Sequence, residues 1–403
     1  MTEKLNRRQF VAGTAAGIAL GGTVLACEDG AASPPVQPVQ PQAEADAPAG
    51  GHEKPAEQAA QGEKAPEAEP KAAPVQEKAF PMNVRGKLVQ VTAAGATEKI
   101  KKTNEEVVRK MVAEALMKFT GESDPVKAIG RFIKTDDVVG IKVNALGSPY
   151  AAVHPATAFA LADLCHQLGI AKNKIYIYDQ YGSRMRKAGY KLSRNPKGPA
   201  DEYPVHFHGT LGYETAKVHL GGKNKHNRKP FPSQVPKLLK ELTAVINLCC
   251  PKDHDLTGVT GALKNVAYGN IERVPIFHCK PECNPVCVHD GICNVAQIYK
   301  HEQLGGKVRL VVCDALRVLY QGGPQDNMTF KKAHNAVLVS TDPVAMDRAI
   351  LEIVNGYRKE RGLKPVEEDR GGRRAPRFIE SAAKLGLGEP DLAKITWDKH
   401  ELA

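Results

Sequence analysis

Several features that mark other classes of protein are missing from this sequence. The N-terminal apolar run from Phe10 to Ala26 is short and interrupted by four glycines, so it does not make a convincing transmembrane helix. Aromatic residues form only 5% of the chain, and no basic stripe interleaved with aromatics is present, which argues against nucleic-acid binding. The GxxxxGK[ST] spacing is absent and no GxGxxG follows a predicted strand, so neither nucleotide-binding loop is predicted.

The first 27 residues resemble a twin-arginine export signal. Arg7 and Arg8 precede Phe10 and a weakly apolar segment, in the order typical of such signals. Cys27 ends the tetrapeptide VLAC, which is similar to a lipoprotein processing box with valine where leucine is commonest. We predict export by the twin-arginine route to the periplasm or cell envelope, with membrane contact only through a lipid anchor on Cys27. Simple cleavage before Cys27 is the alternative.

Residues 28–82 are rich in Ala, Pro, Glu and Gln and contain almost no large apolar side chains. Such a segment cannot bury enough apolar surface to offset its ordering entropy, so it is predicted to be a disordered tether. Residues 1–82 hold 7 Lys and Arg against 11 Asp and Glu, whereas the whole chain is +11. Residues 83–403 therefore carry about +15, which suits anionic substrates or anionic lipid, with solubility as the simplest alternative.

Residues 83–403 contain five apolar runs whose ends carry polar residues. They are VVGIKVN, ending at Lys142 and Asn144; KIYIYD, ending at Asp179; AVINLCCPKDH, ending at Lys252 and His254; VRLVVCD, ending at Asp314; and AVLVSTD, ending at Asp342. Such runs are typical of strands buried on both faces, and helical patterns alternate with them. We predict one α/β domain, with a largely parallel or mixed sheet flanked by helices and a ligand site at the carboxyl ends of the strands.

The segment CCPKDHDLTGVTGALKN has the highest density of polar residues. Its lysines, threonine hydroxyls and backbone N–H groups could hold an anion. We predict that His254 is an acid–base group and Lys264 an electrostatic clamp. Asp179 could join this chemistry, with helix capping or turn formation as its commoner role. The predicted catalytic residues are Lys252, His254, Lys264 and Asp179, and the predicted cofactor- or ligand-binding residues are Lys142, Asn144, Thr257, Thr260, Asn265 and Asp314.

As a set, four segments resemble the signatures of domain-of-unknown-function family 362. They are LCCPKDHDLTGVTGALKN, VVGIKVN, CDALRVLYQGGPQDN and LVSTDPVAMDR. The resemblance covers most of residues 85 to 355, and it implies an α/β domain that often carries an export signal and is sometimes joined to iron–sulfur modules. It implies no particular reaction. The matching positions also include Gly322, Gly323, Pro324 and Asp342.

Four cysteines lie within HCKPECNPVCVHDGIC, which begins at His278. Pro281 and Pro285 argue against a regular helix, so the segment is predicted to be a loop. Four thiolates could bind zinc or an iron–sulfur cluster, although the spacing is not of the ferredoxin type; disulfides are the alternative in an exported protein. The predicted metal ligands are Cys279, Cys283, Cys287 and Cys293. Cys165 and Cys313 fit core positions better.

His206 and His208 alternate along a predicted extended segment, so both could face one side as a metal pair, although a solvated basic loop is the preferred interpretation.

The sequence as a whole leads to three functional hypotheses. The first is an exported metal- or iron–sulfur-binding protein with a redox role on an anionic substrate or a redox partner. The second is a metal-independent enzyme acting on an anionic small molecule, with disulfides in the cysteine loop. The third is a non-catalytic anchored binding protein.

Overall fold

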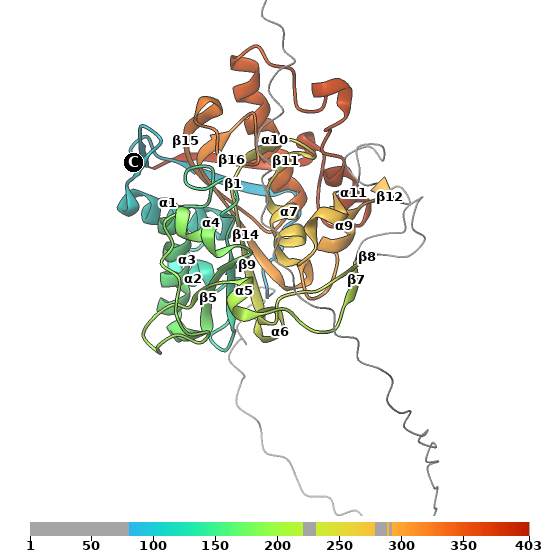
Figure 1. The fold of residues 1–403 in the computed structure, drawn as a ribbon. Coiled ribbons are helices and arrows are strands. Elements are labelled where there is room, and N and C mark those ends of the chain that lie inside the picture. The colour runs from blue at the N-terminus through green and yellow to red at the C-terminus, as the bar shows by residue number, and fades with distance from the viewer. Residues whose placement is uncertain (1–79, 221–230, 279–287, 290–291, 403) are drawn as a thin grey trace, which may run out of the picture. The chain divides into compact units, whose positions relative to one another are not determined.

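The protein is represented by a computed structural model that describes residues 80–220, 231–278, 288–289 and 292–402 (Figure 1). The predicted export signal and nearly all of the predicted tether fall outside these residues. Within the described part, none of the helices is both long and apolar enough to cross a membrane.

A ten-stranded mixed sheet forms the centre of the fold. All strands of its main path run in one direction except β15, which is antiparallel to both of its neighbours. This arrangement confirms the predicted α/β class with a largely parallel sheet. The path runs, from edge to edge, through β16 (Thr396–Glu401), β1 (Lys87–Thr92), β15 (Lys331–Ser340), β14 (Val308–Leu319), β9 (Ala244–Cys249), β4 (Val139–Lys142), β5 (Ile175–Asp179) and β6 (Val205–Phe207).

Helices cover both faces of the sheet (Figure 1). Strand residues alternate between the two resulting cores: Ile246 and Leu248 belong to one, whereas Val245 belongs to the other. Both cores are apolar, and full burial of one such aliphatic side chain contributes roughly 1.5–3 kcal/mol. The first core lies under α1 (Glu105–Thr120), α2 (Pro125–Ile129) and α3 (Pro155–Gln167), and the second under α7 (Ala262–Ala267), α9 (Asn294–Tyr299), α10 (Pro343–Glu360) and α11 (Phe378–Lys384).

Shorter elements complete the described part. Strands β10 and β11 pair with each other, and β10 continues the sheet beside the end of β14. The remaining elements are β2 (Thr97–Glu98), β3 (Lys102–Thr103), α4 (Gly182–Lys187), α5 (His208–Leu211), β7 (Val218–Leu220), β8 (Phe231–Ser233), α6 (Leu238–Glu241), β10 (Lys252–His254), β11 (Gly258–Thr260), α8 (Val274–Phe277), β12 (Val288–His289) and β13 (Ile292–Cys293).

Side chains at the helix starts explain where two long helices begin. Asn104 accepts a hydrogen bond from the N–H of Val107 at the start of α1. Asp342 accepts from the N–H groups of Val344 and Ala345 at the start of α10, with Pro343 in the first helical position. Asp342, at the end of the fifth apolar run, thus caps α10.

One of the five expected strand ends is wrong, and another lies on the opposite side of the sheet from the predicted ligand site. Strand β14 continues past Asp314 to Leu319, and the Asp314 carboxylate instead accepts hydrogen bonds from the N–H of His154 and the hydroxyl of Thr157 at the start of α3. Strand β15 runs antiparallel, so Asp342 lies at the edge opposite the carboxyl ends of β4, β5 and β9. A run of apolar residues reveals a buried strand but not its direction or its full length.

The isolated cysteines and histidines also have defined positions. Cys165 and Cys313 are buried in the two cores, as predicted. His206 and His208 are buried as well, so the preferred interpretation of a solvated loop is wrong for them. His206 lies in β6 and His208 begins α5, so the extended segment needed for a metal pair ends between them.

The order of the strands creates a switch point between β4 and β9. From β4 the chain moves outward through β5 to β6, and then returns across the sheet to β9 and β14. Where the connections reverse in this way, the loops after the two strands separate and leave a crevice at their carboxyl ends. The topology therefore places a ligand crevice beyond Lys142 and Cys249.

Candidate functional site

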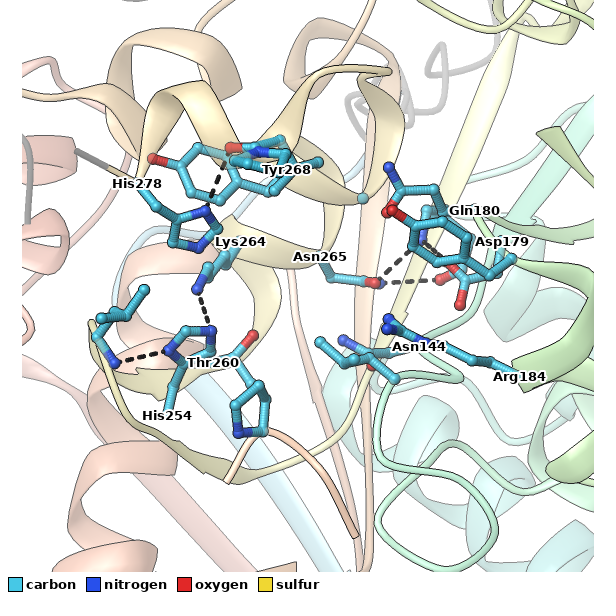
Figure 2. Close-up of a pocket in the computed structure, with 18 of the residues that line it drawn as sticks. Asn144, Asp179, Gln180, Arg184, His254, Thr260, Lys264, Asn265, Tyr268 and His278 are labelled. Atoms are coloured by element: carbon cyan, nitrogen blue, oxygen red, sulfur yellow. Dashed lines mark hydrogen bonds and ion pairs between the residues drawn. The ribbon is translucent and has the colours of Figure 1, made fainter. Parts of the chain in front are cut away.

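A cavity of about 640 Å³ lies at this edge of the sheet (Figure 2). Its size falls within the range of about 300–1,000 Å³ that is usual for small-molecule sites. Seven of the predicted catalytic or ligand-binding residues line it, namely Lys142, Asn144, Asp179, His254, Thr260, Lys264 and Asn265. Lys252, Thr257 and Asp314 do not line the cavity, although the first two contact residues that do.

One wall of the cavity contains a buried ion pair. Lys142 Nζ lies 2.6 Å from Asp179 Oδ1, and it also donates to the carbonyl of Val143 at 2.8 Å and to Asn265 Oδ1 at 3.2 Å. Burial by itself would raise the pKa of Asp179, but the charge and hydrogen bond of Lys142, with the N–H of Ala145, lower it below its ordinary value. Three oxygen acceptors around one nitrogen fit a charged ammonium group.

Two neighbours shape the environment of Lys142. The Asn265 amide donates to the Lys142 carbonyl at 3.1 Å and to Asn247 Oδ1 at 2.9 Å, which turns its own oxygen toward the ammonium. A Cβ atom on Gly269 would lie 2.8 Å from Lys142 Nζ, closer than real Cβ contacts. A side chain at this position would therefore displace the Lys142 ammonium from its hydrogen bonds.

A second pair, His254 and Lys264, lies on another side of the cavity (Figure 2). Lys264 Nζ is 2.6 Å from His254 Nε2. His254 Nδ1 accepts the backbone N–H of Leu256 at 3.1 Å, so the neutral ring carries its proton on Nε2. That proton must point at Lys264, whose nitrogen can accept it only as an uncharged amine. Lys264 in turn donates to Thr257 Oγ1 at 3.1 Å.

Electrostatics at this pair agree with an uncharged lysine. Burial lowers the pKa of His254 well below its ordinary value. Burial likewise lowers the pKa of Lys264 well below its ordinary value, and no carboxylate among the described residues pairs with it. Two buried lysines at one cavity thus differ in charge because one faces a carboxylate and the other an imidazole.

Aromatic rings enclose the second pair. His278 stacks on His254 with 5.7 Å between ring centroids and an interplanar angle of 8°, and Tyr268 contacts His278 edge-on at 4.7 Å. His278 Nδ1 lies 3.2 Å from the carbonyl of Val274, which makes Nδ1 the protonated nitrogen. Its Nε2 is then a buried acceptor with no hydrogen-bond partner in the described part of the chain. Burial lowers the pKa of His278 to about 3.

Arg184 of α4 and its neighbour Tyr181 complete the lining. The Arg184 guanidinium carbon lies 4.5 Å from the Tyr181 ring centroid, and no carboxylate in the described ranges forms an ion pair with it. Neither Arg184 nor Tyr268 was predicted as a site residue. The only signal for Arg184 was the basic segment SRMRK soon after Asp179, and nothing in the sequence pattern singled out Tyr268.

Lys252 has a supporting position. Its ammonium donates to Asn144 Oδ1 at 2.6 Å and to the carbonyl of Leu146, so it holds the segment that follows β4. Asn144 and Leu146 line the cavity, whereas Lys252 does not. Burial lowers the pKa of Lys252.

Three of the four predicted metal ligands, Cys279, Cys283 and Cys287, lie outside the described residues. Cys293 is buried at the end of β13, and burial raises the pKa of its thiol to about 12. The described part of the chain contains no group of three or more His, Cys, Asp or Glu side chains placed to hold a metal ion. Metal binding by the four cysteines stays a prediction.

Comparisons with known proteins bear on the family. The model of the domain of unknown function DUF362 matches residues 139–352, slightly more than half of the chain. No curated protein matches the chain. Among solved structures, the lactate racemase apoprotein from Thermoanaerobacterium thermosaccharolyticum is similar with a TM-score of 0.36 and 14% identity over 68% of this chain. The match spans 58% of that structure, and so weak a likeness carries no functional argument. By its sequence, the chain belongs to the DUF362 family of domains of unknown function.

Proposed function

We propose that the protein is a metal-independent enzyme that binds a small anionic molecule in the cavity and transfers protons through His254 and Lys264. The observation that carries the proposal is the 2.6 Å contact between Lys264 Nζ and His254 Nε2, combined with a backbone N–H on Nδ1. An uncharged buried amine beside a neutral imidazole is an arrangement suited to general acid–base catalysis near neutral pH.

The two groups have complementary tasks in this proposal. Lys264 accepts a proton from the bound molecule, and the His254 Nε2–H that it previously accepted becomes free to donate to an oxygen of the same molecule. Lys264 therefore acts as a base and not as the predicted electrostatic clamp. Arg184, which has no carboxylate partner within the described residues, attracts the anionic group instead. The net positive charge of the domain favours the approach of an anion.

The experiment is proton exchange in deuterated water, followed by proton NMR, with glycolate, glycerate, malate and pyruvate as probes. We expect exchange of the hydrogen next to the carboxylate or carbonyl for at least one probe. His254→Asn should slow it by roughly 10²–10⁴-fold, the usual contribution of a positioned acid–base group. His334→Asn, which changes a histidine outside the cavity lining, is the matched control. Binding without exchange would leave a non-catalytic binding protein instead.

A second candidate function is the redox role predicted from the cysteine segment. His278 lines the cavity and directly precedes Cys279, and Cys293 directly precedes α9, which packs on the helix that carries Lys264. Both ends of the segment therefore adjoin the proposed site. Four thiolates would hold zinc or an iron–sulfur cluster, which would supply Lewis-acid chemistry or electron transfer.

Metal and acid-labile sulfide analysis of protein purified without air tests this second candidate. Stoichiometric iron with visible absorption would support the redox role, and zinc without colour would replace it by a structural or hydrolytic site. Few free thiols and no metal would make the segment a disulfide brace. A thiol count on the denatured protein should be made in parallel, because it separates the last outcome from loss of metal during purification.

We also propose that the chain is exported by the twin-arginine route and anchored through Cys27, on the strength of the residues before position 28. Cell fractionation of the full chain and of a variant with Lys at positions 7 and 8 tests export. The wild type should reach the cell envelope and the variant should stay in the cytoplasm. Release of Cys27→Ser from the membrane fraction would indicate the lipid anchor.

A further inference from the structure

We propose that Lys264 is a nucleophile that forms an imine with an anionic carbonyl compound, an aldehyde or 2-oxo acid, bound in the same cavity. This inference deepens the proposed function and rests on it, because it assigns the substrate class of the same site. Amines attack carbonyl carbons only in their uncharged form, so the proposal depends first on the protonation of Lys264 and then on groups for the oxygen and the anion.

The hydrogen bonds around the cavity lysines separate Lys264 from Lys142. Lys142 donates to three oxygen acceptors, one of them the Asp179 carboxylate, and a nitrogen so surrounded remains an ammonium. Lys264 has one hydroxyl acceptor, on Thr257, and one imidazole nitrogen that carries its own proton. Of the two lysines that line the cavity in the described part of the chain, Lys264 is therefore the one with the lone pair that nucleophilic attack requires.

A carbonyl oxygen would find a donor next to this amine. The Nε2–H of His254 lies within hydrogen-bond distance of Lys264 Nζ, so an oxygen on the attacked carbon can accept from it. The Nε2 of His278 is buried and has no hydrogen-bond partner among the described residues, and its ring stacks on that of His254. The donor for a carbonyl oxygen at this position is therefore the Nε2–H of His254.

The anionic group has a separate place. Arg184 lines the cavity on the side away from Lys264 and His254, as Figure 2 shows. Its guanidinium lies against the Tyr181 ring and has no carboxylate partner in the part of the chain that is described. A molecule that reaches from Lys264 to Arg184 would thus carry its carbonyl at one end and a carboxylate or phosphate at the other.

The step balances without an oxidant or a metal. The Lys264 nitrogen forms a bond to the carbonyl carbon, and the π electrons of the C=O bond move to oxygen, which takes a proton from His254 Nε2. The carbinolamine then loses its hydroxyl group with a second proton as water, while a C=N bond forms. Both hydrogens of the amine leave, directly or through His254, so the net products are an imine and one water molecule.

Reductive trapping tests the inference on the full chain. The protein is incubated with sodium borohydride and succinic semialdehyde, whose aldehyde and carboxylate lie at opposite ends, and the modified lysine is located by peptide mass spectrometry. We expect a single adduct on Lys264, formed at least about tenfold faster than on any surface lysine, since each unit by which a lysine pKa falls gives about tenfold more free amine. Lys264→Arg should abolish the adduct, whereas Lys331→Arg, which changes a buried lysine paired with Asp326, should not.

Further arms distinguish the possible sources of the result. Neutral butanal should be trapped about tenfold more slowly than succinic semialdehyde, because it lacks the anion that a charge-assisted bond to Arg184 holds. An aldehyde that carries a phosphate in place of the carboxylate shows which anion the site prefers. Adducts spread over exposed lysines with none on Lys264 would overturn the inference. This result comes from the wild-type protein, so it does not depend on whether a variant folds. Proton exchange without trapping keeps the acid–base function and removes the imine. Trapping without proton exchange keeps the imine and removes the acid–base function.

Discussion

The two lysines that line the cavity are both buried, yet their surroundings give them opposite chemistry. Lys142 is 0% exposed and is bonded to a carboxylate, whereas Lys264 is 5% exposed and is bonded to an imidazole and a hydroxyl. Burial penalises the charged form of each lysine, and only the first has a counter-charge to offset that penalty. The group that is hydrogen-bonded to a buried lysine, more than its degree of burial, thus decides whether the lysine attracts an anion or reacts as an amine.

The largest expected effect comes from breaking the charged pair. Lys142→Met leaves the Asp179 carboxylate buried without its counter-charge, so we expect a loss of roughly 3–5 kcal/mol in the free energy of unfolding. Urea unfolding measures it. Lys118→Met, which removes an exposed lysine paired with Glu114, is the matched control and should change stability by less than about 1 kcal/mol. Equal losses in the two variants would mean that Asp179 is not ionised in the folded protein.

A smaller disturbance of the same pair is available at Gly269. The Cβ of Gly269→Ala would press on Lys142 Nζ, and overpacking of this kind costs typically about 1–3 kcal/mol. Gly356→Ala is the control, because a Cβ there meets nothing within 4 Å. Within α10 that control should raise stability by about 0.5–1 kcal/mol. Stability that stays unchanged in Gly269→Ala would show that Lys142 can move aside.

Dependence of stability on pH sharpens the comparison. Lys264 has a lower pKa in the folded protein than its ordinary value of 10.5, so the unfolded chain binds more protons between the two values. Stability therefore rises with pH in this window, by up to about 1.4 kcal/mol per pH unit, and Lys264→Met should lose this slope. Urea unfolding at three pH values between about 7 and about 9 measures it. An identical slope in wild type and variant would mean a charged Lys264.

Asp179 should behave in the opposite way. Its pKa is lower in the folded protein than the ordinary value of 3.8, so its contribution is complete above that value and is lost as the pH falls through the folded-state pKa. In acid, wild type should therefore lose more stability than Asp179→Asn. Acid titration of the unfolding free energy for both proteins is the measurement, and parallel curves would contradict the assignment.

The smallest expected effect concerns Arg184. Arg184→Met should weaken the binding of succinic semialdehyde about tenfold, as expected for loss of one charge-assisted hydrogen bond. Isothermal titration calorimetry measures the affinity. Arg186→Met removes a positive charge from the same short helix but not from the cavity lining, so it should bind like wild type. If both variants weaken binding equally, general charge attraction and not a specific contact is responsible.

Much of the fold could be predicted from local pattern, because buried parallel strands require near-continuous apolar runs. Strands β4, β5 and β9 follow the predicted runs, and Lys142 and Asp179 stand at their ends as expected. The direction of β15 and the continuation of β14 past Asp314 could not be predicted, since both depend on pairing between distant segments. Hydrophobic pattern specifies burial, and tertiary contacts specify direction.

The site was predictable in part for a related reason. His254 and Lys264 were both proposed from one dense motif, but their contact depends on how β10, β11 and α7 fold back on each other. Lys252 comes from the same motif and lies outside the cavity lining. His278 and Arg184 come from other segments, and nothing in their spacing indicates that they face the same space. Residue type suggested the chemistry, and only the three-dimensional structure selected the participants.

Helix α7 carries Lys264 and Asn265 as consecutive residues. Neighbouring positions on a helix point in directions about 100° apart, so one helix presents an amine to His254 and an amide to Lys142. Any rotation of this short helix that brought the amine closer to a substrate would turn the amide away from the ammonium. The Lys264–His254 pair and the Lys142–Asp179 pair are thus coupled through α7. A change in the position of either pair should displace the other.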